Sequence, residues 1–170
     1  MVGRMKLGDA PDTIVVAERI RAAWRDLRRA GSTGAVRTYL YEPDAPLDVA
    51  QADALDLIVT HAPIRMSEVA ALLRVDPSTA TRTIAKLQDR TLVVREPDPD
   101  DARAILVTPS RAGAVLHRRV RSRANELLIE TLDAFSGPDR ELLADLLERL
   151  VEAVDEARFV RGLRPSQTSP

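Results

Sequence analysis

The sequence predicts a mostly α-helical protein built around a winged helix-turn-helix, with a small β-hairpin as its wing. Of the 170 residues 45% are apolar but only 3% are aromatic, so we expect a core of aliphatic side chains, which is typical of helices. Within residues 66–107, two short helical stretches are followed directly by two short strand-like stretches. This succession is the outline of a winged helix-turn-helix.

The N-terminal region predicts two helices. The first is expected to start at Thr13, a residue type that caps helices, and to close at Gly31. Residues 33–41 predict a second, short helical stretch, which the proline-containing segment 42–46 breaks. One face of the first helix is apolar and consists of Val16, Ile20, Ala23, Trp24, Leu27 and Ala30.

Residues 47–62 predict the helix that opens the winged lobe. Asp48 and Gln51 stand in the spacing of a capping box, in which each side chain satisfies a backbone N–H group of the other residue. The connector that follows, residues 62–65, leaves room for one or two strand residues. We therefore expect a helix and then a very short strand before the helix-turn-helix.

The helix-turn-helix itself is predicted from the residues that begin its two helices. Ser67 is expected to cap a helix of under two turns. Asp76 is expected to cap the second helix, which runs to about Arg90. Pro77 takes the first position of that helix, where a missing N–H group costs nothing.

The wing and two long helices complete the prediction. Residues 91–96 and 103–107 predict two strands, joined by the polar loop 97–102. Ser110 is expected to cap a long helix that ends near Phe135. A last helix, 139–159, carries an apolar face of Leu142, Leu143, Leu146, Leu147, Leu150, Val151 and Val154, and the tail 161–170 is disordered by composition.

Composition excludes several classes of function. Cysteine is absent, which removes disulfides, thiolate metal sites and cysteine nucleophiles. The longest apolar run has five residues, so no membrane span is expected, and the chain is predicted to be cytoplasmic. Net charge is −1, but residues 64–123 carry 12 basic and 7 acidic side chains, an excess of +5. A polyanion would therefore meet the middle of the chain.

The predicted helix 77–90 has an unusual exposed face. Its inner face is expected to hold Ala80, Ile84 and Leu87, with Thr83 at the edge. Solvated helix faces usually carry Glu, Lys and Gln, because Ser and Thr are poorer helix formers. The outer face here carries Ser78, Thr79, Thr81, Arg82 and Lys86.

Contact with DNA explains that face better than a plain solvated surface, which is the alternative. Short hydroxyl side chains let a helix approach a duplex closely and donate to phosphates or base edges. Arginine can donate two hydrogen bonds to guanine. We therefore predict that Ser78, Thr79, Thr81 and Arg82 read the major groove and that Lys86 contacts a phosphate.

Residues 47–155 resemble the MarR family of bacterial transcriptional regulators. The most specific segment is "DDARAILVTPSRAG", which matches the wing and following helix of that family at Asp101, Arg103, Val107 and Gly113. The segment "SEVAALLRVDPSTATRTIAKL" also resembles the helix-turn-helix of the family. Pro109 and Ser110 replace the usual Leu and Thr of the family, which is a minor departure because serine caps a helix equally well.

Two other departures concern positions where the family often has glycine. Arg74 stands in the turn between the two short helices, and Thr91 follows the second of them. If the Arg74 position is left-handed, arginine costs about 1 kcal/mol there, but its side chain is a candidate phosphate contact. A β-branched Thr91 predicts an altered helix end or local strain.

The resemblance implies a homodimer in which the N- and C-terminal helices of two chains interleave. The wide leucine face of 139–159 agrees with this, although a helix buried within one chain is the alternative. We therefore predict four regions: N-terminal dimerisation helices 1–46, a winged DNA-binding lobe 47–109, C-terminal dimerisation helices 110–160, and the tail 161–170. Such a dimer would bind a pseudo-palindromic operator of double-stranded DNA.

The resemblance also implies roles for the wing and for an effector. Arg103 would enter the minor groove with Asp101 orienting its guanidinium group, whereas an ordinary turn salt bridge is the alternative. Many relatives respond to small ligands between the dimer helices and the winged lobe. Candidate pocket residues are Trp24, Tyr39, Tyr41 and His61, although Trp24 also suits core or dimer packing and His61 a capping role.

Two rival functions remain. An enzyme is not expected, because His61 and His117 are far apart and no glycine-rich phosphate loop is present. The wing loop lacks the glycine and the downstream glutamate of a calcium loop, so no cofactor or metal is predicted. The second rival is a winged helix that binds protein instead of DNA, which the overall charge mildly favours. Repression is the expected mode of regulation because dimers of this kind occlude promoters.

Overall fold

The structure is a computed structural model that describes residues 11–31, 33–41 and 47–160. The chain divides into two compact units, Met1–Pro46 and Leu47–Pro170. The division falls where the first predicted region ends. The predicted boundary between residues 109 and 110 stays a prediction, and the tail 161–170 lies outside the described residues.

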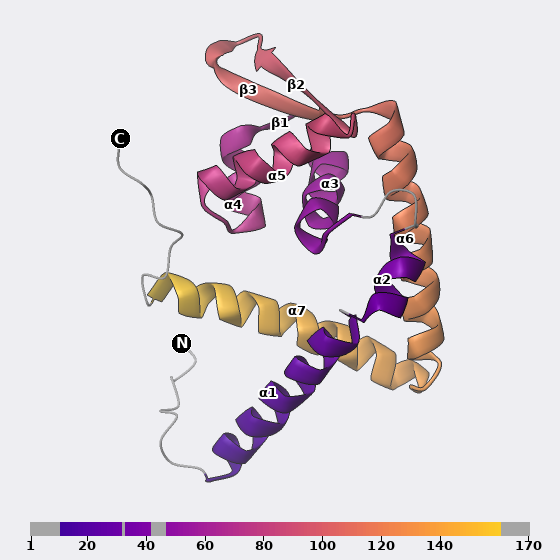
Figure 1. Ribbon diagram of the computed structural model, residues 1–170. Coiled ribbons are helices and arrows are strands. Elements are labelled where there is room, and N and C mark those ends of the chain that lie inside the picture. The colour runs from indigo at the N-terminus through magenta and orange to yellow at the C-terminus, as the bar shows by residue number, and fades with distance from the viewer. Residues whose placement is uncertain (1–10, 32, 42–46, 161–170) are drawn as a thin grey trace. The chain divides into compact units, whose positions relative to one another are not determined.

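Helices dominate both units (Figure 1). None of the helices in the described ranges is both long and apolar enough to cross a membrane. The bounds of the helices are α1 Pro11–Gly31, α2 Gly34–Leu40, α3 Val49–His61, α4 Met66–Leu73, α5 Pro77–Asp89, α6 Arg111–Leu132 and α7 Gly137–Val160.

The first unit contains α1 and α2. The helix α1 begins at Pro11, two residues before the predicted cap Thr13, so the prediction of a Thr13 cap was wrong. Proline is favoured in the first turn because its missing N–H group has no partner there in any case. The apolar face of α1 is exposed, and Ile20, Trp24 and Leu27 each leave more than half of their surface open.

The second unit opens with α3, whose predicted capping box is confirmed. The Asp48 side chain accepts from the Gln51 backbone N–H at 2.8 Å, and the Gln51 side chain accepts from the Asp48 N–H at 3.3 Å. The start of α4 differs from the prediction. Glu68, rather than Ser67, supplies the side chain that satisfies a backbone N–H group there: it accepts a hydrogen bond from the Arg65 N–H at 3.0 Å.

The winged lobe contains a three-stranded antiparallel sheet in the order β1-β3-β2, and its β2–β3 hairpin forms the wing. The strands are β1 Ile64–Arg65, β2 Val93–Asp98 and β3 Asp101–Pro109. The strand β3 extends further than predicted at both ends, whereas β2 has the predicted length but lies two residues later in the sequence. Pairing from Val93↔Pro109 to Pro97↔Ile105 sets these bounds, which the alternation of side chains alone does not mark. Only two residues remain in the turn.

The winged lobe encloses its own core. The largest side chains in it that are wholly shielded from solvent are Leu55, Ile58, Val69, Ile84, Leu87 and Val107, which come from α3, α4, α5 and β3. Burial of each such side chain stabilises the fold by about 1.5–3 kcal/mol. The packed core therefore fixes the helices and strands that carry the side chains on the surface of the lobe.

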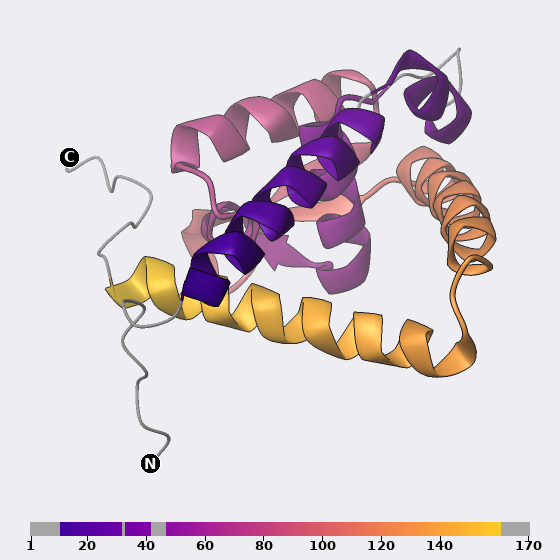
Figure 2. The same cartoon turned by 90° about the horizontal axis from the view of Figure 1, so that it is seen from below.

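The helices α6 and α7 extend from this lobe and are joined by a sharp turn (Figure 2). The predicted Ser110 cap of α6 is confirmed, since its hydroxyl accepts from the Gly113 backbone N–H at 3.0 Å. Most of the predicted leucine face of α7 is exposed within the chain. Its open side chains are Leu142, Leu146, Leu147, Leu150, Val151 and Val154, with 40–54% of each exposed.

Candidate nucleic-acid interface

The helix α5 is held by one buried face and one firm cap. Ala80, Thr83, Ile84 and Leu87 are buried, as the sequence predicts. The predicted Asp76 cap is also confirmed, because its carboxylate accepts from the Thr79 backbone N–H at 2.9 Å. The opposite face of α5 is thereby fixed in orientation.

That opposite face carries the five side chains predicted to contact DNA. Ser78, Thr81, Arg82 and Lys86 are exposed and Thr79 is half-buried. They lie within about two and a half turns of one helix, so they would meet a ligand together.

The hydroxyl groups have a second role that sequence reasoning missed. Ser78 Oγ donates to Asp76 Oδ1 at 2.5 Å, and Thr79 Oγ1 donates to Asp76 Oδ2 at 2.7 Å. These hydrogen bonds, of which the one from Ser78 has the largest effect, hold the pKa of the Asp76 carboxyl well below its usual value. Thr81 Oγ1 donates to the Pro77 carbonyl oxygen at 2.8 Å. The hydroxyls therefore stabilise the helix start, and each oxygen can still accept a hydrogen bond.

Arg82 is positioned by its neighbour one turn earlier. One of its Nη atoms donates to Thr79 Oγ1 at 3.2 Å, while the side chain stays exposed. Guanidinium carries five N–H donors, so this single bond leaves donors for a paired contact. A planar group held in this way suits recognition of two acceptors at once.

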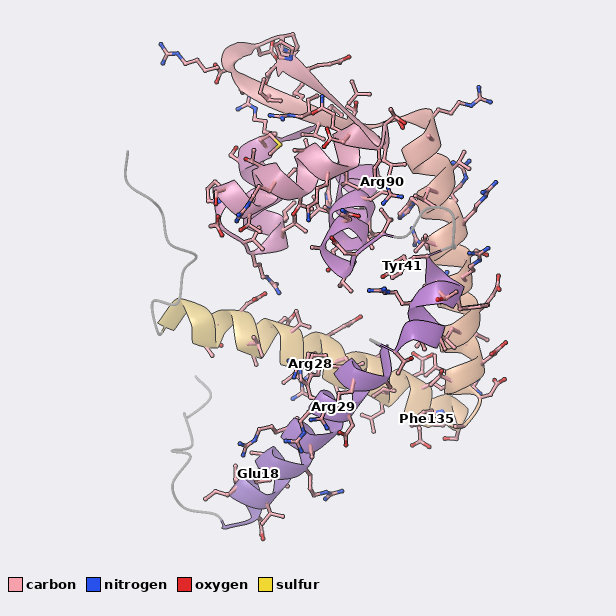
Figure 3. All side chains as sticks on the ribbon, in the orientation of Figure 1. Glu18, Arg28, Arg29, Tyr41, Arg90 and Phe135 are labelled. Atoms are coloured by element: carbon pink, nitrogen blue, oxygen red, sulfur yellow. The ribbon has the colours of Figure 1, made fainter. Side chains whose placement is uncertain are left out.

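Two cations at the C-terminal end of α5 contact the start of α3. Lys86 Nζ lies 3.8 Å from Asp48 Oδ2, and Arg90 donates to Gln51 Oε1 at 3.3 Å. Figure 3 shows Arg90 at the end of α5, beside α3. The Lys86 pair is exposed and therefore weak, so the ammonium group can exchange this carboxylate for another anion.

The turn before α5 is left-handed at Arg74, with φ at 57°. A left-handed conformation was considered from the sequence, because the MarR family, which the sequence resembles, often has glycine at this position. The guanidinium group of Arg74 forms an ion pair with Asp155 on α7. A phosphate contact by Arg74 would have to compete with this carboxylate, so the predicted contact stays untested.

The wing presents Arg103 on β3, where its side chain is exposed. Asp101 Oδ1 accepts from the backbone N–H of Arg103 at 3.0 Å. This carboxylate therefore contacts the backbone of Arg103, which differs from the expected contact with the guanidinium group. Asp101 therefore stabilises the turn of the wing, and the direction of the Arg103 side chain is set by its position on β3.

A buried carboxylate that sequence reasoning missed anchors the wing. Asp98, at the end of β2, is 6% exposed, and its Oδ2 accepts from Arg65 Nε at 2.8 Å and lies 2.7 Å from Arg65 Nη2. Its Oδ1 accepts from the Asp100 backbone N–H at 2.9 Å. The bond from Asp100, assisted by Arg65, holds the pKa of Asp98 below its usual value. This pair ties the wing to the start of α4.

A basic recess of about 340 Å³ lies between the start of α4, the helix α5 and the wing. It brings together Thr81 and Arg103, two residues predicted to contact DNA from different elements. Arg65 and Arg95 also line it, and Nε of Arg95 is buried without a hydrogen-bond partner among the described residues. Neither Arg65 nor Arg95 was predicted, because their strands place them here through long-range pairing.

The end of α5 is fastened to α6. Ser110 donates from its backbone N–H to the Leu92 carbonyl at 3.0 Å and from its hydroxyl to the Thr91 carbonyl at 2.6 Å. A Cβ on Gly113 would lie 2.0 Å from the Leu92 carbonyl oxygen, so this position requires glycine. Thr91 itself is left-handed, with φ at 57°, which agrees with the predicted strain at this helix end.

The four candidate effector residues are divided between the two units. Trp24, Tyr39 and Tyr41 belong to the first unit, and His61 belongs to the second. His61 lines two adjoining recesses of about 450 Å³ each between α3 and α4. One of them also contains Asp53, whose pKa is raised by burial and by the neighbouring Asp56 carboxylate. The predicted effector pocket stays a prediction.

The other histidine, His117, lies on α6 and is buried against α3. Its Nε2 is 2.7 Å from Asp56 Oδ1, and its Nδ1 is buried without a partner in the described part of the chain. Among the described residues no cluster of His, Asp or Glu side chains could hold a metal ion. This pair connects the winged lobe to α6.

Comparison with known proteins agrees with this geometry. Residues 45–104 match the model of the MarR family. A helix-turn-helix-type transcriptional regulator of Mycobacterium leprae, itself uncharacterized, is 33% identical over 115 residues, which cover 68% of this chain and 80% of the relative.

Two solved structures share the fold. FabT of Streptococcus pneumoniae in complex with DNA matches with a TM-score of 0.70 at 15% identity, covering 84% of this chain and 96% of FabT. The regulator PcaV of Streptomyces coelicolor with its natural ligand matches with a TM-score of 0.59 at 20% identity, covering 90% and 99%. Both likenesses show the fold. The relative of M. leprae, together with the family match, shows that the chain belongs to the MarR family of helix-turn-helix transcriptional regulators.

Proposed function

We propose that this regulator is a homodimeric repressor that binds a pseudo-palindromic operator in double-stranded DNA. The observation that carries the proposal is the exposed face of α5, where Ser78, Thr81 and Arg82 project from a helix with a fully buried opposite face. A helix held in this way can enter the major groove. The complex of FabT with DNA supports the same use of this fold.

Each side chain has a distinct role in the proposal. Arg82 donates two hydrogen bonds to a guanine, while the hydroxyls of Ser78, Thr79 and Thr81 contact base edges or phosphates. Lys86 contacts a phosphate and contributes no sequence preference. The hydroxyls exchange their present bonds to Asp76 and Pro77 for DNA acceptors, which a hydroxyl does by rotation.

The wing contributes a minor-groove contact. Arg103 enters the groove next to the one that α5 reads, where narrow A·T-rich segments attract a guanidinium group. The pairing of Arg65 with Asp98 keeps the wing in place. Of the acidic wing residues, Asp98 is turned inward and Asp101 binds backbone, which reduces the repulsion of phosphates by the wing.

Dimerisation follows from the exposed apolar faces of α1 and α7. Exposed contiguous apolar surface marks an interaction site, and a second copy of the chain offers a matching surface. Two copies place two α5 helices on successive half-sites about 34 Å apart. A dimer bound there blocks access to a promoter, which supports repression.

We further propose that a small ligand regulates the dimer, with the recesses beside His61 as part of its site. The structure of PcaV with its natural ligand supports a ligand-responsive use of this fold. The ligand would favour one spacing of the two α5 helices over another. Because the operator lies on the chromosome, the proposal also places the protein in the cytoplasm.

The rival is a winged helix that binds protein. The experiment that separates the two is selection of binding sites from a random DNA library with the purified chain, followed by a salt titration on the enriched site. We expect a pseudo-palindrome with half-sites about ten base pairs apart and an affinity that falls steeply with salt. No enriched site, with weak and salt-insensitive binding, would reject the proposed function in favour of a protein partner.

A further inference from the structure

The helix α6 is divided into a basic half and an apolar half. Its first half carries five arginines at positions 111, 118, 119, 121 and 123, and no acidic residue precedes Glu126. Its second half exposes Leu128 and Ile129, whose surfaces are more than half open. The two halves therefore suit different partners.

Three of the arginines form a continuous exposed surface, which we call the arginine ridge: Arg111, Arg118 and Arg121. At 100° per residue they lie within about 80° of one another, on the side of α6 opposite to buried Gly113 and Leu116. Nitrogen-tipped side chains project from this outer side in Figure 3. Within the described ranges the structure gives none of the three a carboxylate partner.

A solvated helix face does not explain the ridge well. Such faces usually interleave both signs of charge, because like charges repel one another along a helix. Here the like charges extend over about 15 Å of helix, at 1.5 Å per residue, without an intervening acid. A surface of this kind suits a polyanion whose charges are also closely spaced, and duplex DNA carries one negative charge per about 1.7 Å of its axis.

The ridge is continuous with the proposed DNA interface. The first turn of α6 is bonded to the end of α5 through Ser110, which contacts the carbonyl groups of Thr91 and Leu92. Gly113 allows the two backbones to approach closely at this joint. Arg111, the first residue of α6, therefore lies near the end of α5. The ridge extends from there along the outer side of α6.

We propose that the arginine ridge binds backbone phosphates of DNA that flanks the base pairs read by α5. This inference rests on the proposed DNA-binding function and adds a second contact surface to it. The apolar half of α6 is the part that resembles a subunit interface, since it adjoins the exposed leucines of α7 in sequence. The ridge lies at the other end of the helix, which favours DNA over a second copy of the chain as its partner.

The test compares a triple variant, Arg111→Gln with Arg118→Gln and Arg121→Gln, with wild-type protein on two duplexes. The short duplex ends at the base pairs that wild-type protein protects, and the long one adds about one helical turn (~10 base pairs) on each side. On the long duplex, the slope of log K against log salt should fall in magnitude by about 5, because the dimer loses six phosphate contacts, three on each side, and each removes about 0.9. On the short duplex the slope should change little.

Two controls accompany the triple variant. Arg25→Gln with Arg28→Gln and Arg149→Gln removes the same charge from α1 and α7, and it should leave the difference between the duplexes unchanged. Arg111→Lys with Arg118→Lys and Arg121→Lys keeps the charge and should keep the wild-type slope. Circular dichroism and thermal melting check that the exposed substitutions leave the fold intact.

The outcomes separate the two proposals. A triple variant with the slopes of the control on both duplexes, or with equal losses on both, would overturn the flanking contact while leaving operator binding in place. Weaker dimerisation in sedimentation, with unchanged slopes, would also overturn it and would assign the ridge to the partner chain. If wild-type protein showed no salt-dependent binding to any duplex, the proposed function itself would fail and the ridge contact with it.

Discussion

The winged lobe and the helix α7 are built from the same aliphatic residue types but bury them differently. In the lobe, Leu55, Ile58 and Ile84 are at most 1% exposed. On α7, Leu142 and Leu150 remain 54% and 40% exposed. The lobe completes its core within one chain, whereas α7 presents a core-like face that the described residues leave largely exposed. Substitutions in the lobe should therefore change folding or DNA binding, and those on α7 should change assembly.

The largest effect is expected from Leu150→Glu, at the centre of the apolar face of α7. A leucine lost from an interface costs about 1.5–3 kcal/mol, and in a two-fold dimer each substitution occurs twice. The dimer dissociation constant should rise at least about 100-fold, because 1.4 kcal/mol corresponds to a factor of ten. Analytical ultracentrifugation over a concentration series measures it. Glu152→Gln, on the polar face, is the control, and an unchanged Leu150→Glu dimer would refute the comparison.

The next largest effect is expected from Gly113→Ala at the joint between the lobe and α6. The new Cβ would lie 2.0 Å from the Leu92 carbonyl oxygen, which belongs to the backbone, so the backbone itself would have to shift. We expect a loss of about 3 kcal/mol in the free energy of unfolding, at the upper end of overpacking effects. Urea unfolding measures it. Gly137→Ala is a matched control, since a Cβ there meets nothing within 4 Å, and equal stabilities of the two variants would contradict the close approach.

Arg82→Ala tests the outer surface of the lobe. Affinity for the selected operator should fall by about 1–3 kcal/mol and the sequence preference should relax, while folding and dimerisation stay unchanged because the side chain is exposed. Lys86→Ala is the control, because a lost phosphate contact weakens binding to all sequences alike. Equal losses for Arg82→Ala on specific and random DNA, measured by fluorescence anisotropy, would exclude base reading by Arg82.

Arg103→Ala tests the wing in the same assay. Its loss should be greatest where the sequence flanking the half-site is A·T-rich, because a narrow minor groove has the more negative potential. The expected cost is about 1 kcal/mol on such flanks and less on G·C-rich ones. A loss that does not depend on the flank would place Arg103 outside the minor groove.

The lobe was predictable from sequence wherever local rules decide the structure. The buried face of α5, the Asp76 cap and the capping box at Asp48 all depend on residues within a few positions of one another. Arg74 and Thr91 were marked because glycine is usual at these positions in the family, and both are left-handed. Local spacing was therefore sufficient for the core and for the exposed face of α5.

Sequence reasoning failed where partners are distant or where two local partners compete. The pair of Arg65 with Asp98 spans 33 residues, so no spacing rule could reveal it. At the start of α4, Glu68 accepts from the Arg65 N–H in place of the expected Ser67. The hydroxyls of α5 were assigned to DNA alone, although Ser78 and Thr79 also bond the cap. These misses concern how the site is held together, and the site residues themselves remain predictions.

The smallest effect is expected from Thr91→Gly, which tests the backbone strain that the winged lobe tolerates. Thr91 has a left-handed backbone, with φ at 57°, which a β-branched residue adopts at a cost of about 1 kcal/mol and glycine adopts without it. Thr91→Gly should therefore raise the free energy of unfolding by up to about 1 kcal/mol and Tm by about 2–4 °C. Thr91→Ala, which keeps Cβ, should gain less. A Thr91→Gly variant less stable than wild type in calorimetry would show that this backbone is not left-handed. The lobe can carry this strain because Ser110 and Gly113 fasten the end of α5 to α6.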